Sequence, residues 1–409
     1  MDIMAVAKTD EFNNYINGEW SKSASGRTFD NVNPADTGDI VGRFQASSAD
    51  DAQAAVAAAA AAFDAWKKTP ISKRAKILNG AADYLEANVG QIAEELTREE
   101  GKALNLSKDE VLRSAQTIRF YAVEGQSFSG ETYPQDDPDM IVYSQREPLG
   151  VVTVISPWNF PVSIPARKIA PALIAGNTVV FKPSSDAPLS GYRLAQAFVE
   201  AGIPKGVLNF ITGRAGDVGA AITEAPAVRA ISFTGSTAAG QHIHRSVSLS
   251  TRTQMELGGK NPLIVMEDAD LDRAVDLTIK GGLSLSGQAC TGTSRVLVMA
   301  SVKAAYTREE IFGPVIAIIE VSSYADAITK ANDTEYGLSA AIVTSNPRYA
   351  HDFAHDIQSG TVKINRTTTG NLINAPFGGL KQSSTSTFRE SGRAGLEFYT
   401  QIKTVYRGC

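Results

Sequence analysis

The chain has a single interior cysteine, Cys290, in the stretch "GQACTGTSR" at residues 287–295; the only other cysteine, Cys409, is the last residue. Free cysteine often packs in a core as a small hydrophobic side chain. Here it stands between a glycine-glutamine pair and small hydroxyl residues, which leave room for a molecule to approach the sulfur. The stretch therefore allows two interpretations, a core residue or a thiolate nucleophile.

The histidines narrow the chemistry open to that cysteine. A Cys–His hydrolase needs a histidine beside its nucleophile, and the four histidines are His242, His244, His351 and His355. The last two, in "HDFAH", are spaced one helical turn apart, but the stretch lacks the glutamate of a His-Glu-x-x-His zinc motif. We interpret that stretch as a helix surface and expect no metal site.

An asparagine and a glutamate stand in unusual local settings. Asn159 in "SPWNFP" follows the apolar run "VVTVI", so it is either a rigidly held amide donor or a turn residue bonded to its own backbone. Glu256 in "MELGGKNP" precedes two glycines and is either a general base or a surface carboxylate.

Two further stretches could contact phosphate or ribose groups. In "FTGSTAAG", Gly235 and Gly240 bracket a turn into a helix, with Ser236 beside its N-terminus, where phosphate binds well. The spacing differs from the dinucleotide fingerprint Gly-x-Gly-x-x-Gly, and a plain glycine turn is the alternative. Lys182 in "FKPSSDAP" ends a buried strand and either reaches a ligand or is solvated there.

Short apolar, β-branched runs alternate with alanine-rich helical stretches from residue 151 onward, which predicts an α/β fold with parallel sheets covered on both faces. Earlier in the chain, we expect two strands around Asn17-Gly18 and a helix from a Ser48–Asp51 capping box to about Lys68. A second, longer helix is expected from about residue 72 to residue 100. The stretch "MIVYSQREP" and the tail both resemble exposed edge strands.

Length and composition limit the class of protein. The 409 residues suggest two or three domains, with 43% hydrophobic and 20% charged residues. A net charge of −5 without long single-sign runs argues against nucleic acid or an anionic membrane as partner. Two cysteines cannot build a disulfide framework, and no stretch resembles a signal peptide or spanning helix. We expect a cytoplasmic protein.

In chain order, seven motifs resemble those of the NAD(P)-dependent aldehyde dehydrogenase superfamily. They are "PWNFP", "KPSSDAP", "FTGSTAAG", "MELGGKNP", "GQACTGTSR", "EEIFGPV" and "APFGGLKQSS". The resemblance implies two Rossmann-like parallel-sheet domains plus a small β oligomerisation arm, in a homodimer or homotetramer. The implied domains are a nucleotide-binding domain (1–128 and 148–256), a catalytic domain (257–385) and the arm (129–147 and 386–409).

The resemblance also implies a mechanism. Cys290 would add to an aldehyde to give a thiohemiacetal, while Asn159 and the Cys290 backbone N–H stabilise the oxyanion. After hydride transfer to the nicotinamide, Glu256 would activate the water that hydrolyses the thioester. A histidine partner is not needed.

The same resemblance assigns the cofactor, NADP or NAD. The implied contacts are Trp158, Lys182, Ser185, Gly235, Ser236, Gly240, Leu257, Glu310 and Phe312. Ser185 replaces a glutamate of many NAD-preferring relatives, which would repel a 2′-phosphate; serine should therefore permit NADP⁺.

For the substrate, the tail from "APFGG" is most similar to dehydrogenases of 2-oxoglutarate semialdehyde. Arg167 aligns with an arginine that reads a distal carboxylate, although a structural ion pair is its alternative role, and Phe377 matches an aromatic residue of the substrate tunnel. Ser284 replaces a second arginine of some succinate-semialdehyde enzymes. The alternative substrates are succinate semialdehyde and a broad range of aliphatic aldehydes. An alternative reaction passes the thioester to coenzyme A, which the presence of Glu256 argues against. A non-enzymatic alternative is an inactive relative with a binding or structural role.

One departure from the family stands near residues 303–308, where "VLVMASVKAAY" runs almost at once into "TREEIFGP". Family members carry several dozen residues there. A real deletion would remove packed elements and place Glu310 and Phe312 in doubt. We therefore interpret the gap as residues that the printed sequence omits.

Overall fold

The computed structural model describes residues 10–299 and 310–408. They fall into two compact units, the first built from Met1–Phe233, Ile243–Thr253 and Arg393–Cys409, the second from Thr234–His242 and Gln254–Gly392. The expected gap near residues 303–308 lies outside the described residues. The expected three-domain boundaries stay a prediction; the structure groups residues 129–147 and 393–409 with the first unit.

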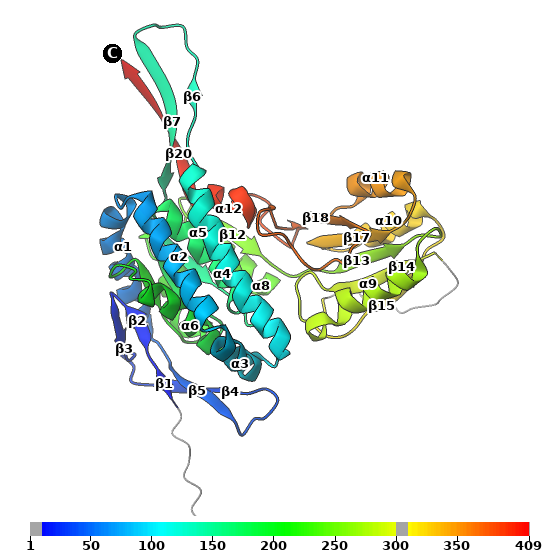
Figure 1. Cartoon of the computed structure of the whole chain (residues 1–409), viewed down its shortest axis with the longest axis horizontal. Coiled ribbons are helices and arrows are strands. Elements are labelled where there is room, and N and C mark those ends of the chain that lie inside the picture. Colours follow the sequence, from blue (N-terminus) through cyan, green and yellow to red (C-terminus); the bar gives the residue numbers. More distant parts are fainter. Residues whose placement is uncertain (1–9, 300–309, 409) are drawn as a thin grey trace, which may run out of the picture. The chain divides into compact units, whose positions relative to one another are not determined.

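The first unit holds most of a seven-stranded sheet (Figure 1) in the order β12-β11-β8-β9-β10-β2-β3; residues 254–256 of β12 are grouped with the second unit. Neighbours among β11, β8, β9 and β10 pair in parallel, as the apolar runs predicted. The strands are β2 (Asn14–Ile16), β3 (Glu19–Ser21), β8 (Val151–Ile155), β9 (Thr178–Lys182), β10 (Leu208–Phe210), β11 (Val228–Thr234) and β12 (Arg252–Glu256). The predicted turn between β2 and β3 is confirmed, with φ of 51° at Asn17 and 88° at Gly18.

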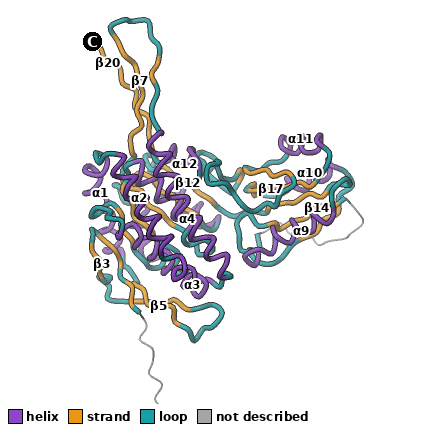
Figure 2. Tube along the Cα trace, viewed as in Figure 1, coloured by secondary structure: helices purple, strands orange, loops and turns teal. Residues whose placement is uncertain are grey.

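Helices cover this sheet (Figure 2), and the first of them begins at the predicted capping box. They are α1 (Ala49–Lys67), α2 (Ile71–Ala87), α3 (Val89–Glu100), α4 (Leu104–Ser127), α5 (Ser163–Ala175), α6 (Pro188–Glu200), α7 (Ala215–Thr223) and α8 (Thr237–Ser246). The single long helix expected from 72 to 100 was wrong. It breaks at Asn88, whose side-chain amide donates to the Tyr84 carbonyl (2.8 Å), and α3 ends at the left-handed Gly101.

Two smaller sheets complete the unit. The sheet β1 (Glu11–Phe12), β5 (Ile40–Gln45) and β4 (Thr28–Val32) precedes α1. The other pairs β20 (Thr400–Gly408) antiparallel to β7 (Met140–Pro148), which also pairs with β6 (Thr132–Tyr133). The tail is therefore not one strand, because helix α12 (Gly392–Phe398) precedes β20.

The second unit holds a parallel five-stranded sheet in the order β15-β14-β13-β17-β18. Its elements are β13 (Asn261–Val265), α9 (Leu271–Leu283), the 3₁₀ turn Ser284–Gly287, β14 (Thr293–Val298), β15 (Ala317–Glu320), α10 (Tyr324–Asn332), β17 (Ser339–Val343), α11 (Pro347–Asp356) and β18 (Thr361–Ile364). A short pair, β16 (Tyr336–Gly337) and β19 (Leu380–Lys381), lies beside it. Helix α9 lies on one side of this sheet and α10 and α11 on the other (Figure 1). Alternate strand residues face opposite sides, so that Leu263 packs with α9 and Ile264 with α10 and α11.

Among the described residues, no helix combines the length and the apolar composition that crossing a bilayer requires.

Candidate active site

Cys290 lies in the loop between the 3₁₀ turn and β14, as a half-buried cysteine that forms no disulfide. Leu285 and Ser286 both have positive φ, 53° and 52°, so the chain turns sharply before the cysteine. A Cβ on Gly287 would collide with the backbone of Gly313, which explains why glycine stands there. The loop is thus a tight, packed structure, not an open surface segment.

Asn261, the first residue of β13, ties this loop to the sheet. Its side-chain amide donates to the carbonyls of Cys290 (2.8 Å) and Gly292 (2.9 Å), and its oxygen accepts from Ser339 N (3.0 Å). Asn261 is buried. Because these three strands are parallel, Cys290 lies at the amino ends of β13, β14 and β17.

Glu256 ends β12 with its side chain buried. The backbone carbonyl of Glu256 accepts a hydrogen bond from Gly235 N (3.2 Å), and its backbone forms an isolated antiparallel β-bridge with Ser384. A Cβ built on Gly378, in the "APFGG" stretch, would lie 3.0 Å from Glu256 Oε1, so the carboxylate rests against that glycine.

Glu310 and Phe312 line one cavity together with glycines of the nucleophile loop. The lining residues are Gly259, Gly282, Gly287, Ala289, Gly292, Thr293, Ser294, Glu310, Ile311, Phe312, Gly313 and Val315. Glu310 Oε1 accepts from Gly259 N (3.0 Å), and burial raises the pKa of this carboxyl. A Cβ on Gly259 would lie 2.6 Å from the Cys290 carbonyl. The structure therefore brings Glu310 and Phe312 to the segment that also contacts Cys290.

Asn159 belongs to the first unit, in the turn between β8 and α5, and is 3% exposed. Its neighbour Trp158 is half-buried. The Asn159 carbonyl accepts from Lys102 Nζ (2.7 Å), and Glu110 accepts from the backbone N–H groups of Val162 and Ser163. The turn is consequently held by two charged side chains from outside it.

Lys182 is the last residue of β9 in the same unit, and Ser185 follows three residues later. Lys182 is 6% exposed and donates to the Pro183 carbonyl (3.0 Å), and burial lowers its pKa to about 8. The alternative of a solvated lysine is wrong for this residue. The Ser185 hydroxyl donates to the Gly213 carbonyl (3.0 Å).

Gly235 and Ser236 directly precede α8, and Gly240 lies in its first turn. Ser236 Oγ accepts from Ala239 N (3.3 Å), and Gly240 N donates to the Ser236 carbonyl (3.0 Å). A Cβ on Gly240 would collide with the Leu257 side chain, so glycine lets the helix pack closely there. Leu257 itself is 6% exposed.

The two candidate substrate residues lie in different units. Arg167 is half-buried on α5, and its charge contributes to the lowered pKa of Arg113 on α4, after the larger effect of burial. Phe377 is buried and exchanges backbone hydrogen bonds of 2.6 and 2.7 Å with Glu390. The structure therefore groups Cys290, Glu256, Glu310, Phe312 and Phe377 in one unit.

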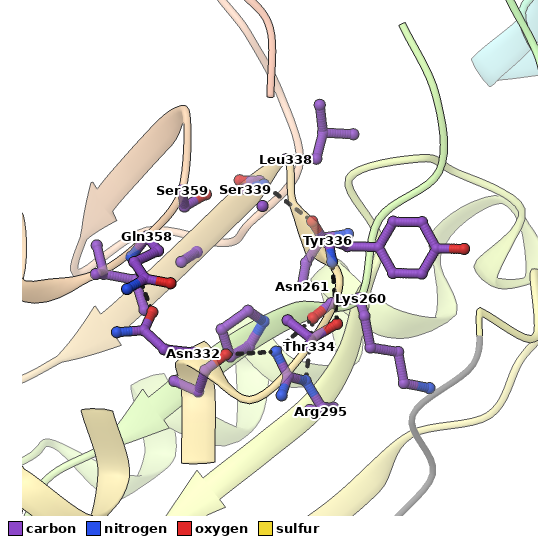
Figure 3. A pocket seen from close by; sticks show the side chains of 15 residues that line it. Lys260, Asn261, Arg295, Asn332, Thr334, Tyr336, Leu338, Ser339, Gln358 and Ser359 are labelled. Carbon is purple, nitrogen blue, oxygen red and sulfur yellow. Dashed lines mark hydrogen bonds between the residues drawn. The ribbon is translucent and has the colours of Figure 1, made fainter. Parts of the chain in front are cut away.

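Sequence reasoning missed several buried polar residues around these sites. One is Arg295, whose guanidinium donates to the carbonyls of Lys260 and Ala331 at 2.7–3.0 Å (Figure 3). It also donates to the Lys330 carbonyl at 3.0 Å. It anchors the C-terminal end of α10 to the start of β13. The others are Asn261, which lies in the "MELGGKNP" motif but was given no role, and Lys102 and Glu110, which lie outside all seven motifs.

The aldehyde dehydrogenase family model matches residues 20–307 and 303–405. The chain belongs to the aldehyde dehydrogenase family. The resemblance drawn from the seven motifs is confirmed, and so is the expected fold class.

Its relatives are similar along nearly their whole length. The alpha-ketoglutaric semialdehyde dehydrogenase of Bacillus subtilis is 37% identical, covering 98% of this chain and 99% of that protein. The 2,5-dioxopentanoate dehydrogenase of Saccharolobus solfataricus is 35% identical, covering 95% and 98%. The crystal structure of betaine aldehyde dehydrogenase from Staphylococcus aureus in complex with NAD⁺ superposes with a TM-score of 0.93, at 29% identity over 97% and 95%.

The relatives also carry residues that this chain lacks. The alignment with the B. subtilis protein extends over 483 positions, more than the 409 residues present here. The two ranges that match the family model overlap at residues 303–307. The family pattern is therefore interrupted at the same point where the sequence departs from it, near residues 303–308.

Proposed function

We propose that this aldehyde dehydrogenase oxidises 2-oxoglutarate semialdehyde to 2-oxoglutarate with NADP⁺ or NAD⁺. The observation that carries the proposal is the similarity, at 35–37% identity over nearly the full chain, to two relatives named for this same substrate. Succinate semialdehyde and simple aliphatic aldehydes are the alternative substrates.

In this proposal Cys290 is the nucleophile. Its half-buried thiol lies in a loop of small residues, and the loop is fixed by Asn261, so the sulfur is both accessible and held in place. Attack on the aldehyde carbon moves negative charge to the carbonyl oxygen. Asn159 and the Cys290 N–H would donate to that oxygen, and such donors lower the barrier most when they are held in advance.

Glu256 is the proposed base. A carboxylate next to glycine backbone leaves space for a water molecule, and removal of the water's proton makes it able to attack the thioester carbonyl. The products are the free acid and the regenerated Cys290 thiol. Hydrolysis by water, not transfer to coenzyme A, is therefore the expected second half of the reaction.

The residues at the start of α8 fit a dinucleotide. The hydroxyls of Thr234 and Thr237 are buried at this helix N-terminus and have no hydrogen-bond partner among the described residues. Such hydroxyls, with the exposed Ser236, are the donors that a pyrophosphate uses. When bound, NAD(P)⁺ supplies the acceptor for the aldehyde's hydride.

We assign the remaining predicted residues to the same cofactor. Lys182 and Ser185 would hold the adenosine ribose, and Ser185 lacks the charge that would repel a 2′-phosphate. Trp158, Gly235, Gly240 and Leu257 would shape the site, with Glu310 at the nicotinamide ribose and Phe312 against the ring. Glu310 now bonds Gly259 N, so cofactor binding would have to compete with that hydrogen bond.

Arg167 is the proposed partner of the substrate's distal carboxylate, and Phe377 a wall of its tunnel. A guanidinium pairs with a carboxylate through two parallel hydrogen bonds. The nearby charge of Arg113 supports this role, because two guanidiniums that repel each other favour an anion between them.

We also propose a homodimer or homotetramer in the cytoplasm. The long ribbon formed by β7 and β20 supports association, since its residues Ile402 and Tyr406 are 58% and 70% exposed, and exposed edge strands tend to pair.

The experiment is NADPH and NADH formation by the purified chain with 2-oxoglutarate semialdehyde, succinate semialdehyde and a simple aliphatic aldehyde. A preference for the first substrate supports the proposal. Cys290→Ser should abolish its oxidation, and Arg167→Gln should mainly raise its KM. Equal rates with the aliphatic aldehyde would refute the carboxylate assignment. No turnover with any aldehyde would refute the enzymatic function and favour a binding or structural role.

A further inference from the structure

The turn that carries Asn159 has to keep one conformation for its amide to act on a substrate oxygen. Residues 156–162 between β8 and α5 belong to no helix or strand, and a free turn of this length would sample many conformations. What restrains it is a pair of buried side chains from outside the turn, Lys102 and Glu110.

Lys102 holds the turn at Asn159 itself. It stands between α3 and α4, 3% exposed, and its Nζ donates to the Asn159 carbonyl at 2.7 Å. The same ammonium lies 4.5 Å from the centre of the Phe160 ring. The cation therefore contacts the backbone of one turn residue and the ring face of the next.

Glu110 holds the other end of the turn. Its Oε1 accepts from Val162 N (3.0 Å) and Ser163 N (3.1 Å), the first N–H groups of α5. The N-cap residue Val162 has no side chain able to satisfy them, so the cap comes from a different helix. A carboxylate also suits the positive end of the helix dipole.

The two restraints are linked. Lys102 Nζ donates to Glu110 Oε2 at 2.5 Å, and both side chains are at most 3% exposed. Only Phe160 and Pro161 lie between the two held points, and proline fixes its own φ. The backbone from Asn159 to Ser163 is consequently held at both of its ends by one ion pair.

We propose that Lys102 and Glu110 are positioning residues that hold Asn159 in the orientation from which its amide stabilises the oxyanion. The inference rests on the proposed role of Asn159 in catalysis. Neither side chain is assigned a contact with substrate; each acts through the turn. A carbonyl held by an ammonium also polarises the peptide that follows Asn159, which stiffens the turn further.

The test is a double-mutant cycle on kcat. Lys102→Met should lower kcat about 10- to 100-fold, because a misplacement of about 1 Å costs up to that factor. KM for NADP⁺ should stay within about twofold, since the cycle concerns a chemical step. Lys102→Arg, which keeps a charged donor, should recover part of the loss.

The same substitution in an Asn159→Ala background decides the question. If Lys102 acts through the Asn159 amide, Lys102→Met should change kcat there by less than about twofold, because its target is gone. An equal loss in both backgrounds would overturn the positioning role. If Asn159→Ala alone leaves kcat unchanged, the proposed oxyanion donor is itself wrong, and the positioning role falls with it.

Glu99→Gln is the matched control. Glu99 is also a buried glutamate that caps a helix from outside, accepting from Leu189 N (2.6 Å) and Ser190 N (2.8 Å) at the start of α6. No described hydrogen bond joins Glu99 to the Asn159 turn. The effect of Glu99→Gln on kcat should therefore be the same with Asn159 present and in the Asn159→Ala background.

Hydrogen exchange gives a readout that needs no turnover. Glu110→Gln removes the charge but keeps an oxygen and the volume of the side chain, and should speed exchange of the Val162 and Ser163 amides at least tenfold. Should Lys102→Met fail to fold, this variant replaces it in the cycle. Unchanged exchange in Glu110→Gln would refute the restraint whether or not the enzyme is active.

Discussion

Asn261 offers the sharpest test of how the nucleophile loop is held. Asn261→Ala removes three hydrogen bonds, of 2.8, 2.9 and 3.0 Å, to Cys290 O, Gly292 O and Ser339 N. A typical hydrogen bond contributes about 1 kcal/mol net, and a buried group left without a partner costs about 1–3 kcal/mol. The Ser339 N–H is buried, whereas water can reach the loop around half-buried Cys290. We therefore expect a loss of about 2–4 kcal/mol in the free energy of unfolding.

Asn261→Ala should also change the accessibility of the loop that carries Cys290. Freed from β13, the half-buried thiol should become more accessible, and its alkylation by iodoacetamide should accelerate several-fold in a Cys409→Ser background, where Cys290 is the only thiol. Urea unfolding and the alkylation rate are measured on the same preparations.

Asn209→Ala separates the two effects. Asn209 is a buried asparagine of the first unit that donates to Gly206 O (2.8 Å) and accepts from Asn17 N (3.0 Å). It should lose comparable stability without any change in Cys290 alkylation. Equal alkylation rates in the wild type and Asn261→Ala would refute the reasoning, and so would equal acceleration in both asparagine variants.

Three further predictions follow from particular side chains. Ser185→Glu should raise KM for NADP⁺ at least about tenfold while NAD⁺ still works, because like charges brought together cost several kcal/mol; unchanged cofactor preference would remove Ser185 from the 2′-phosphate site. The pKa of Lys182 is lowered to about 8 by burial, so the ammonium loses its proton as pH rises through 8, and cofactor affinity should fall between pH 7 and 9 in the wild type but not in Lys182→Met. In the 409-residue chain, Val275→Lys on α9, where the side chain is 58% exposed, should change stability by less than about 0.5 kcal/mol, whereas Ala274→Asp on the buried side of the same helix should unfold the second unit in a urea titration.

Much of the fold is encoded in short-range patterns. Fully buried parallel strands need continuous apolar residues, and the runs "VVTVI", "TVVFK" and "PLIVM" each became such a strand. The long helix failed at Asn88 because a side-chain bond to Tyr84 O competes with the helical ladder, and apolar periodicity does not register that competition. Helix α12 was missed for a related reason, since its seven residues are too few for a clear period.

The restraints on the sites were harder to predict than the site residues. Cys290 and Asn159 stand in distinctive motifs, but Lys102 is 57 residues from the carbonyl it holds and Asn261 is 29 residues from Cys290. Only the folded chain brings those pairs together. The motif that contains Asn261 marks the residue but not its role, and the sequence around Lys102 carries no sign of the backbone group that the side chain holds.

The uncovered side of the second unit bears on the residues that this chain lacks. Successive strands β13, β14 and β15 lie side by side, and α9 connects the first two on one face of the sheet. Because parallel crossovers are right-handed, a helix connecting β14 to β15 would lie on the same face as α9. That face carries uncovered apolar side chains, namely Leu271 (67% exposed), Val275 (58%), Ile279 (53%), Leu283 (46%) and Ile318 on β15 (42%).

These residues occupy the place where such a helix would pack, and the relatives' extra residues fall in this same β14–β15 connection. The opposite face of the sheet, under α10 and α11, is buried. In the described residues the five-stranded sheet is nevertheless formed, and Glu310 accepts a hydrogen bond from Gly259 N, while one face of the unit is exposed. An intact mass of 43.4 kDa for a chain that oxidises the semialdehyde would show that catalysis tolerates this exposure. A larger mass would show that the natural chain covers it.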